Sequence, residues 1–156
     1  MKEGWSKWQH FDEKGAHAIS REPGVYQFRC LKDKSLPLSI SRLRKKDSQG
    51  IIYIGKSEDL RKRIFYFWST LKNREKTRHA AGWTFCSFNY FSIFPPRRLQ
   101  FRYKLAKNPL AEEFELLISY RKQFLDLPPL NSTRSEYPGN WKKRMREVFG
   151  VDPLKE

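Results

Sequence analysis

Residues 50–72 limit the fold most strongly, because a short apolar run stands directly before an amphipathic segment. The run 51–56, IIYIGK, has the length and the β-branched residues of a strand. From Leu60 onward, apolar side chains recur at helical spacing and fall within one sector of about 100°. They are Leu60, Ile64, Phe67, Trp68 and Leu71. A helix with one apolar face has to cover a sheet or another helix, so this region predicts a mixed α/β (α+β) fold.

Three further segments have recognisable patterns. Residues 23–30, PGVYQFRC, predict a strand after a Pro-Gly breaker, and residues 98–106, RLQFRYKLA, alternate as a half-buried strand does. Residues 108–124 predict a helix capped by Asn108, with Leu125 still on its inner face. Ser57, followed by two acidic residues, is the expected cap of the helix that begins near Leu60. The first two strands are expected to form an antiparallel hairpin.

Two long connections are inserted between these elements. Residues 31–50 form a polar, basic connection, and the aromatic segment within 72–98 fits either a buried helix or a strand. With 156 residues the chain is expected to be a single domain, 1–156. Its core spans 22–131, with an N-terminal arm or helix at 1–21 and a basic C-terminal tail at 132–156. Cys30 and Cys86 have no C-x-x-C partner and are expected to be buried thiols.

The charge indicates a polyanionic partner. The 32 Lys and Arg residues against 17 Asp and Glu give a net charge of +15, which favours nucleic acid. No apolar run approaches the roughly 18 residues of a membrane span, and the N-terminus lacks the apolar core of a signal peptide. We therefore expect a cytoplasmic protein that binds no membrane. Basic side chains that could contact a DNA backbone are Arg42, Arg44, Lys45, Lys46, Arg61 and Lys62. For the first four, a solvated loop is an equally good interpretation.

Two features are candidates for chemistry: taken singly, Tyr53 favours packing in the sheet, whereas Glu113 fits packing and chemistry about equally. Side chains alternate along a strand, so Tyr53 and Gly55 are expected on one face while Ile52 and Ile54 are buried on the other. In the 108–124 helix, Glu113 falls at the edge of the apolar face. A lone carboxylate there is unfavourable unless a cation meets it.

Several motifs stand together in a recognisable order. The tripeptides GVY (24–26) and YIG (53–55), the segment GKSEDLRKR (55–63), Glu113 and PPLN (128–131) follow one another along the chain. In this order they resemble the GIY-YIG nucleases, and the resemblance covers roughly residues 22–131. It implies a small α/β/α sandwich on a three-stranded antiparallel sheet. It also implies hydrolysis of a phosphodiester bond in double-stranded DNA with Mg²⁺ or Mn²⁺.

The resemblance assigns roles to individual residues. Tyr26 and Tyr53 match the two motif tyrosines, and Arg63 matches the arginine that pairs with the scissile phosphate. Glu113 matches the metal-binding glutamate. The lysine after the glycine of the second motif is Lys56, and the asparagine that closes the site is Asn131.

Two positions depart from the family pattern. Val25 replaces an isoleucine without changing any chemistry, but Phe67 stands where the family often has a histidine or tyrosine. Tyr66 cannot replace that group, since one residue further along a helix points about 100° away. His79 is the remaining candidate, provided that the aromatic segment folds back over the site. The general base is therefore open. A tyrosine, with an ordinary pKa of about 10, could act as the base only if nearby positive charge lowers that value.

The sequence thus predicts a metal-dependent DNA endonuclease, with a compact restriction-type enzyme favoured. Without an appended recognition domain, specificity would come from the insertions, the tails or a homodimer. Three alternatives stay open: a structure-specific repair or phage nuclease, a nucleic-acid-binding module that keeps the fold but has no turnover, and a basic structural protein of a nucleoprotein particle. Phe67 is the feature that favours the binding module.

Overall fold

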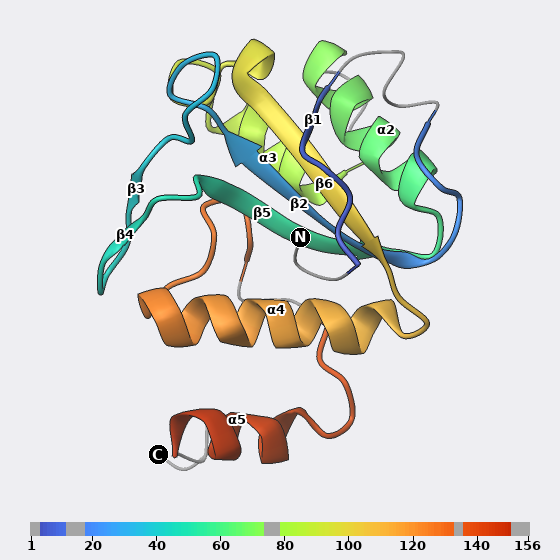
Figure 1. The fold of residues 1–156 in the computed structure, drawn as a ribbon, viewed down its shortest axis with the longest axis vertical. Helices are drawn as coiled ribbons and strands as arrows, with labels where there is room; N and C mark the ends of the chain where they lie inside the picture. Colours follow the sequence, from blue (N-terminus) through green and yellow to red (C-terminus); the bar gives the residue numbers. More distant parts are fainter. Residues whose placement is uncertain (1–3, 12–17, 74–78, 133–135, 151–156) are drawn as a thin grey trace.

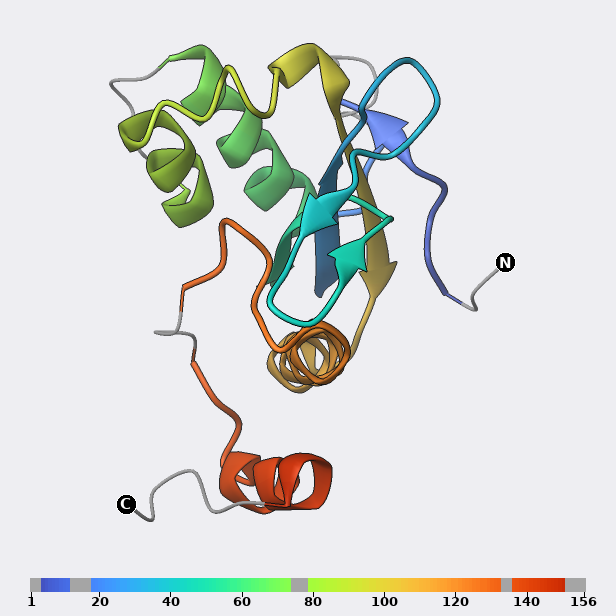
Figure 2. The same cartoon turned by 90° about the vertical axis from the view of Figure 1, so that its left-hand side faces the viewer.

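A central antiparallel sheet lies between helices in the computed structural model, which describes residues 4–11, 18–73, 79–132 and 136–150. The helices α2 (Leu60–Lys72) and α3 (Ala80–Ser87) lie on one side of the sheet (Figures 1 and 2). Helix α4 (Pro109–Phe124) packs on the other side, and α5 (Trp141–Phe149) lies beyond α4, away from the sheet. The predicted mixed α/β (α+β) class is confirmed.

The main sheet contains four strands among the described residues, in the order β1-β6-β2-β5, whereas three were predicted. The three long strands β2 (Gly24–Cys30), β5 (Ile51–Ser57) and β6 (Leu99–Leu105) are the predicted ones. The additional strand β1 (Gln9–His10) pairs antiparallel with β6. It has 2 residues, too few for an alternating pattern to reveal it.

A register shift separates the two isoleucines of β5 that were expected to share a face. Strands β2 and β5 pair Phe28 with Tyr53, and the register then shifts so that Arg29 pairs with Ile51. Ile52 is the extra residue of this bulge. Its side chain joins the same core as Tyr53, while Ile54 packs toward α4. The expectation that Ile52 and Ile54 lie together on one face is therefore wrong.

Helix α2 covers the sheet with the predicted apolar face, since Leu60, Ile64, Phe67 and Leu71 are buried. The ring of Phe67 lies 4.2 Å from that of Phe28, centroid to centroid. The cap is Asp59, whose carboxylate accepts the Lys62 N–H at 2.9 Å. Ser57 was predicted for this role, but it is the last residue of β5.

The structure settles the conformation of the aromatic segment and corrects the prediction for Leu125. The aromatic segment that fitted either a helix or a strand forms α3, followed by a 3₁₀ turn, η1 (Pro96–Arg98). In α4 the predicted cap Asn108 accepts the Ala111 N–H at 3.1 Å. Leu125, predicted for the inner face, is 50% exposed, because the helix ends at Phe124 and the next residue turns outward with a left-handed φ of 55°.

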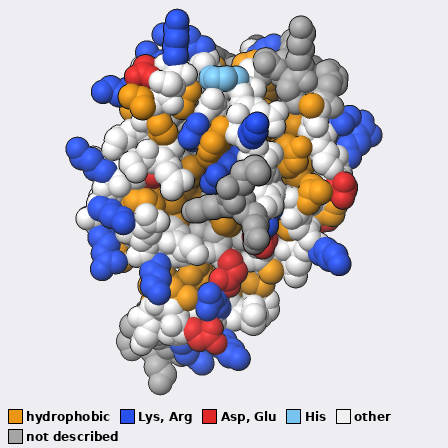
Figure 3. Space-filling model, viewed as in Figure 1, with side chains coloured by type: hydrophobic (Ala, Val, Ile, Leu, Met, Phe, Trp, Pro, Cys, Tyr) orange, Lys and Arg blue, Asp and Glu red, His pale blue; other side chains and the backbone are white. Residues whose placement is uncertain are grey.

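The N-terminal arm is extended over its described residues 4–11 and crosses the front of the sheet in Figure 1. Its two indoles stack on two arginines of the sheet. The Arg29 guanidinium lies 4.3 Å from the Trp8 ring, and that of Arg102 lies 4.6 Å from Trp5 and 4.5 Å from Trp8. We call Trp5, Trp8, Arg29 and Arg102 the Trp/Arg cluster. Figure 3 shows this side of the molecule, where Lys and Arg side chains surround the hydrophobic ones.

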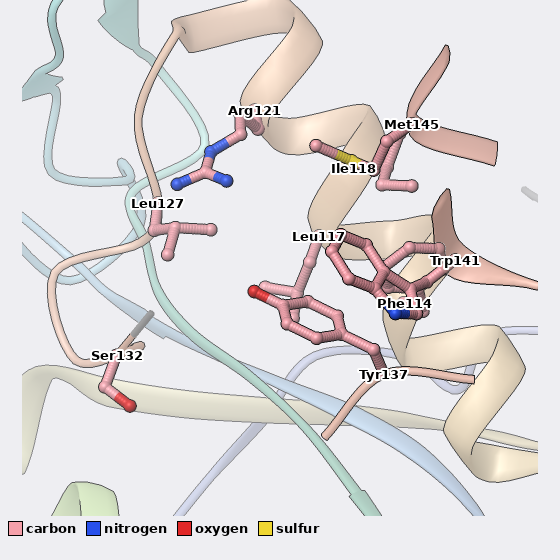
Figure 4. Close-up of a pocket in the computed structure, with 9 residues that line it drawn as sticks. All are labelled: Phe114, Leu117, Ile118, Arg121, Leu127, Ser132, Tyr137, Trp141 and Met145. Carbon is pink, nitrogen blue, oxygen red and sulfur yellow. The ribbon is translucent and has the colours of Figure 1, made fainter. Parts of the chain in front are cut away.

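The C-terminal helix α5 attaches to α4 mainly through polar and aromatic contacts. Arg144 pairs with Glu115, Nε to Oε1 at 2.8 Å. Tyr137, which stacks on Trp141 at 4.9 Å, contacts Phe114 of α4 edge to face at 5.7 Å. An apolar pocket of about 50 Å³ lies between the two helices (Figure 4). Over the described parts of the chain, every helix is too short or too polar to cross a bilayer.

Candidate active site

A cleft of about 410 Å³ opens at the outer edge of β5, between α3, α4 and the residues that follow α4. Five residues predicted for catalysis line it: Tyr53, Lys56, Arg63, Glu113 and Asn131. The remaining lining residues are Ala80, Ala81, Thr84, Leu130, Ser132 and Glu136. The other two predicted residues, Tyr26 and His79, are buried directly behind this group. The fold therefore gathers side chains from five elements and the segment after α4.

Tyr26 and Tyr53 lie together because Gly55 lies beneath them. Tyr26 is paired with Gly55 across the hairpin, and the two phenol rings are 5.9 Å apart. A Cβ at position 55 would come within 2.6 Å of both rings. The phenol rings therefore fill the space next to this glycine.

Arg63 of α2 holds both phenol oxygens by hydrogen bonds. Burial raises the pKa of Tyr53, and the nearby Glu113 carboxylate raises it further, while Arg63 acts in the opposite direction. Burial likewise raises the pKa of Tyr26 well above its ordinary value. Positive charge is present, as the base hypothesis requires, but burial outweighs it, so both hydroxyls hold their protons at neutral pH.

Glu113 is a buried carboxyl group at the cleft. Its side chain comes from α4, is 8% exposed, and accepts the backbone N–H of Lys56. Burial raises its pKa to about 7; Lys56 and Arg63 lower this value, and Glu136 raises it. The Lys56 ammonium is 2.8 Å from the Glu136 carboxylate. The nearby cations thus offset only part of the cost of burying Glu113.

His79 caps the N-terminus of α3 and contacts Tyr26. Its Nε2 lies 2.8 Å from the Tyr26 hydroxyl, and its Nδ1 accepts the Gly82 N–H at 3.4 Å. The neutral ring therefore carries its proton on Nε2 and donates it toward Tyr26. Burial, and then Arg63, lower the pKa of His79 well below its ordinary value, so the ring is neutral at pH 7.

The imidazole lies beside Phe67, the position at which the sequence departs from the GIY-YIG resemblance. Phe67 is fully buried, and its ring centroid is 5.3 Å from that of His79. The N-cap residue of α3 therefore brings an imidazole next to Phe67.

Asn131 anchors the chain to the open edge of β5. Its amide oxygen accepts the Ile54 N–H at 3.0 Å, and its amide nitrogen donates to the Ile54 carbonyl at 2.8 Å. The preceding Leu130 N–H donates to the Ile52 carbonyl at 2.9 Å. Asn131 borders the cleft, but both ends of its amide serve to hold this wall in place.

The six basic residues predicted to bind DNA lie elsewhere; none of their side chains, all of them described, lines the cleft. In the 31–50 connection, which contains the small sheet of β3 (Ile40–Ser41) and β4 (Lys46–Asp47), two of them bind the end of α4. Arg42 pairs with Asp126 at 3.1 Å, and Arg44 donates to the Lys122 carbonyl at 3.2 Å. Lys45 lies over the Phe124 ring and Lys62 over Tyr66.

Arg61, on α2, also has a structural contact. Its Nε donates to the Ile19 carbonyl at 2.7 Å. The contacts of Arg42, Arg44 and Arg61 therefore have structural uses, and a DNA contact by any of the six would be peripheral to the cleft.

Sequence reasoning missed Glu136 and the α3 wall of the cleft. Glu136 reaches Lys56 across 80 positions of the chain, and no motif marks it. Thr84 and Ala80 belong to a segment whose apolar residues show no single helical face. Across the residues that the structure describes, no group of three or more His, Cys, Asp or Glu side chains is arranged to hold a metal ion. Comparisons of the chain with family models, curated proteins and solved structures found no match.

Proposed function

We propose that this chain is a metal-dependent endodeoxyribonuclease that hydrolyses a phosphodiester bond in double-stranded DNA. The observation that carries the proposal is the position of Glu113. This carboxylate of α4 lies in one cleft with Tyr53 and Lys56 of β5 and Arg63 of α2. The ordered resemblance to the GIY-YIG nucleases and the net charge of +15 support the same activity.

Glu113 fits the role of ligand to Mg²⁺ or Mn²⁺. Its pKa of about 7 reflects a carboxylate buried with incomplete compensation, and a divalent cation would supply the missing charge. Mg²⁺ in proteins often takes one or two carboxylates and fills its other positions with water and substrate phosphate, so a single ligand is sufficient. A bound cation would polarise the phosphoryl group and stabilise the leaving oxygen.

Arg63 and Lys56 are the groups that bind the phosphate. A guanidinium can donate two parallel hydrogen bonds to phosphoryl oxygens, so Arg63 would fix the orientation of the scissile bond. Lys56 contributes a point charge, and DNA would take the place of its partner Glu136. Both side chains line the cleft.

A row of hydrogen-bonded side chains leads inward from the cleft. Tyr53 is bonded to Tyr26, and Tyr26 is bonded to His79. Arg63 favours the ionised form of both phenols. We propose that a divalent cation held by Glu113 would add its charge to that of Arg63, so that Tyr53 would release its own proton to solvent before the attack and could then accept the proton of the attacking water. The buried imidazole would orient Tyr26. His79 thus stands in for the group that Phe67 lacks.

The test is incubation with supercoiled plasmid and Mg²⁺. The wild type should nick or linearise the plasmid, and Glu113→Ala should lose this activity. Glu112→Ala is the matched control, because Glu112 is the neighbouring residue but pairs with Lys104 at 2.7 Å outside the cleft. If the wild type and Glu113→Ala both bind DNA and neither cuts any form of it, the chain is a binding module, the reading that the buried Phe67 favours.

Digestion of other DNA substrates distinguishes a restriction-type nuclease from a structure-specific one. Discrete fragments from genomic DNA would identify a restriction-type enzyme, whereas cutting confined to branched or partly unpaired DNA would identify a structure-specific one. The mass of the protein in solution, alone and with DNA, tests for a homodimer.

A further inference from the structure

An apolar surface adjoins the cleft on α3. Trp83 is 51% exposed, Phe88 is 65% exposed and Ile93 is 58% exposed. Large hydrophobic side chains exposed in one stretch of a small protein indicate a contact surface rather than random scatter. We call Trp83 and Phe88, which belong to α3 and its C-cap, the α3 apolar surface.

This surface is continuous with the wall of the cleft. Residues four apart in a helix lie on one face, so Phe88, at the C-cap of α3, follows Ala80 and Thr84 in a single row. Ala80 and Thr84 line the cleft. Trp83 lies on the adjacent row. A ligand that enters the cleft along α3 therefore meets both rings.

The Phe88 ring is supported by other aromatic rings. It stacks on that of Tyr90 at 6.0 Å with an interplanar angle of 25°. Tyr90 in turn contacts the buried rings of Phe85 and Phe94 edge to face. These contacts fix the orientation of the Phe88 ring, which suits stacking on a flat partner.

The charge of the adjoining cleft favours a polyanionic partner. Ala80 and Thr84 line the cleft together with Lys56 and Arg63, and the chain has a net charge of +15. Flat apolar rings beside these cations match a nucleic acid strand, whose phosphates meet the cations while its bases stack on the rings. In a paired duplex the bases stack on one another, so the rings need bases that are unpaired.

We propose, building on the proposed function, that Trp83 and Phe88 stack on unpaired bases next to the bond that is cut. The substrate is then DNA with an unpaired or distorted segment beside the cleft, rather than uniformly paired duplex. Each ring adds affinity for that DNA alone, and the two together select where the cleft engages it.

The experiment measures binding by fluorescence anisotropy, with EDTA present so that nothing is cut. The probes are a short labelled duplex and the same duplex with an internal stretch of unpaired bases. Trp83→Ala and Phe88→Ala should each weaken binding to the partly unpaired probe about 5- to 50-fold. The paired duplex should lose less than about twofold, because phosphate contacts dominate there.

Phe65→Ala is the matched control. Phe65 is 48% exposed on α2, and it points away from Arg63 because two residues along a helix are about 200° apart. Its loss should change neither affinity. Trp83→Phe keeps a ring and should retain most of the binding, and circular dichroism checks that every variant is folded.

Equal losses on both probes, or no loss on either, would overturn the inference. So would a wild-type dimer that Trp83→Ala converts to a monomer, since a second copy would then cover this surface. Binding in EDTA needs no cleavage, so these outcomes are separate from the plasmid test. A wild type that binds neither probe would overturn this inference and the proposed function together.

Discussion

Two regions of the molecule hold half-buried arginines, and the groups that surround these arginines differ. In the Trp/Arg cluster, Arg102 donates to the Gln27 side chain at 2.6 Å and 2.9 Å, and Arg29 donates to that of Gln100 at 2.9 Å. Indole rings cover both guanidiniums. At the cleft, Arg63 faces two phenols and an open volume, and a buried carboxylate lies nearby.

This difference distinguishes a structural role of arginine, in the Trp/Arg cluster, from the kind of role found in functional sites, at the cleft. In the cluster, neutral amides and rings satisfy the arginines, although burial lowers the pKa of Arg102 to about 10. At the cleft, the groups shift one another's pKa values, and added cations or phosphates would change them. Perturbed groups around an open cleft are typical of functional sites, whereas the cluster holds the N-terminal arm on the sheet.

The largest expected effect comes from replacing an arginine of each region by alanine. Arg63→Ala should lower the rate of plasmid cleavage by about 100- to 1000-fold, because it removes a preorganised donor to the phosphate. Arg102→Ala is the matched control and should leave the rate within about twofold. A loss of similar size in both variants would mean that Arg63 affects cleavage only by stabilising the fold.

Glu113→Gln should stabilise the protein at high pH. The pKa of Glu113 is about 7 in the folded chain and 4.5 ordinarily, so the folded state binds the proton more tightly. Ionising Glu113 therefore lowers the free energy of unfolding. This loss is absent below the ordinary pKa, grows as the pH rises from 4.5 to 7, and stays constant above that.

At pH 8 we expect the variant to gain roughly 1–3 kcal/mol in free energy of unfolding, and at pH 4 almost nothing. Urea unfolding at both values measures it, with Glu112→Gln as the control. A gain that does not depend on pH would contradict the assignment.

Trp8→Ala should loosen the arm without affecting the cleft. Removing the indole that covers both arginines should lower the free energy of unfolding by roughly 1–2 kcal/mol. Cleavage should stay within about twofold of the wild type. Trp83→Ala, which removes an indole that is 51% exposed, should cost less than about 0.5 kcal/mol. If Trp8→Ala abolished cleavage, the arm would have to be counted with the site.

The smallest effect concerns Glu136. Glu136→Gln releases the Lys56 ammonium from its partner at 2.8 Å, so metal-free affinity for duplex DNA should rise about 2- to 5-fold and the gain should shrink as salt is added. Anisotropy titrations at two salt concentrations measure it. An equal gain in Glu112→Gln would show that only the net charge had changed.

The long elements could be predicted because their periodicity is local. The alternation of Leu99, Phe101 and Tyr103 and the apolar face of α2 both follow from residues close in sequence. The same periodicity marked Glu113, since it placed a carboxylate where only apolar side chains were expected. Helix α3 gave no such signal, because its apolar residues are spread around the helix and only Ala81, Gly82 and Phe85 are buried.

What could not be predicted depends on long-range geometry. The bulge at Ile52 changes which face that side chain takes, and it is visible only once β2 and β5 are paired. The pairing of Lys56 with Glu136 and the contact of His79 with Tyr26 join residues 80 and 53 positions apart. No local pattern of residue types records such contacts, so His79 could be named as a candidate but not located.

Because Gly55 has no side chain beyond a hydrogen atom, the proposed activity depends on the correct register between β2 and β5. If β2 and β5 slipped by one residue, Tyr26 would face a side chain instead of Gly55, and the two phenols could not come within 5.9 Å of each other. A slip of one residue also reverses the faces of a strand. A chain with a misaligned hairpin would therefore lack the paired phenols, so the proposed cleavage of DNA would require the strands to have aligned first.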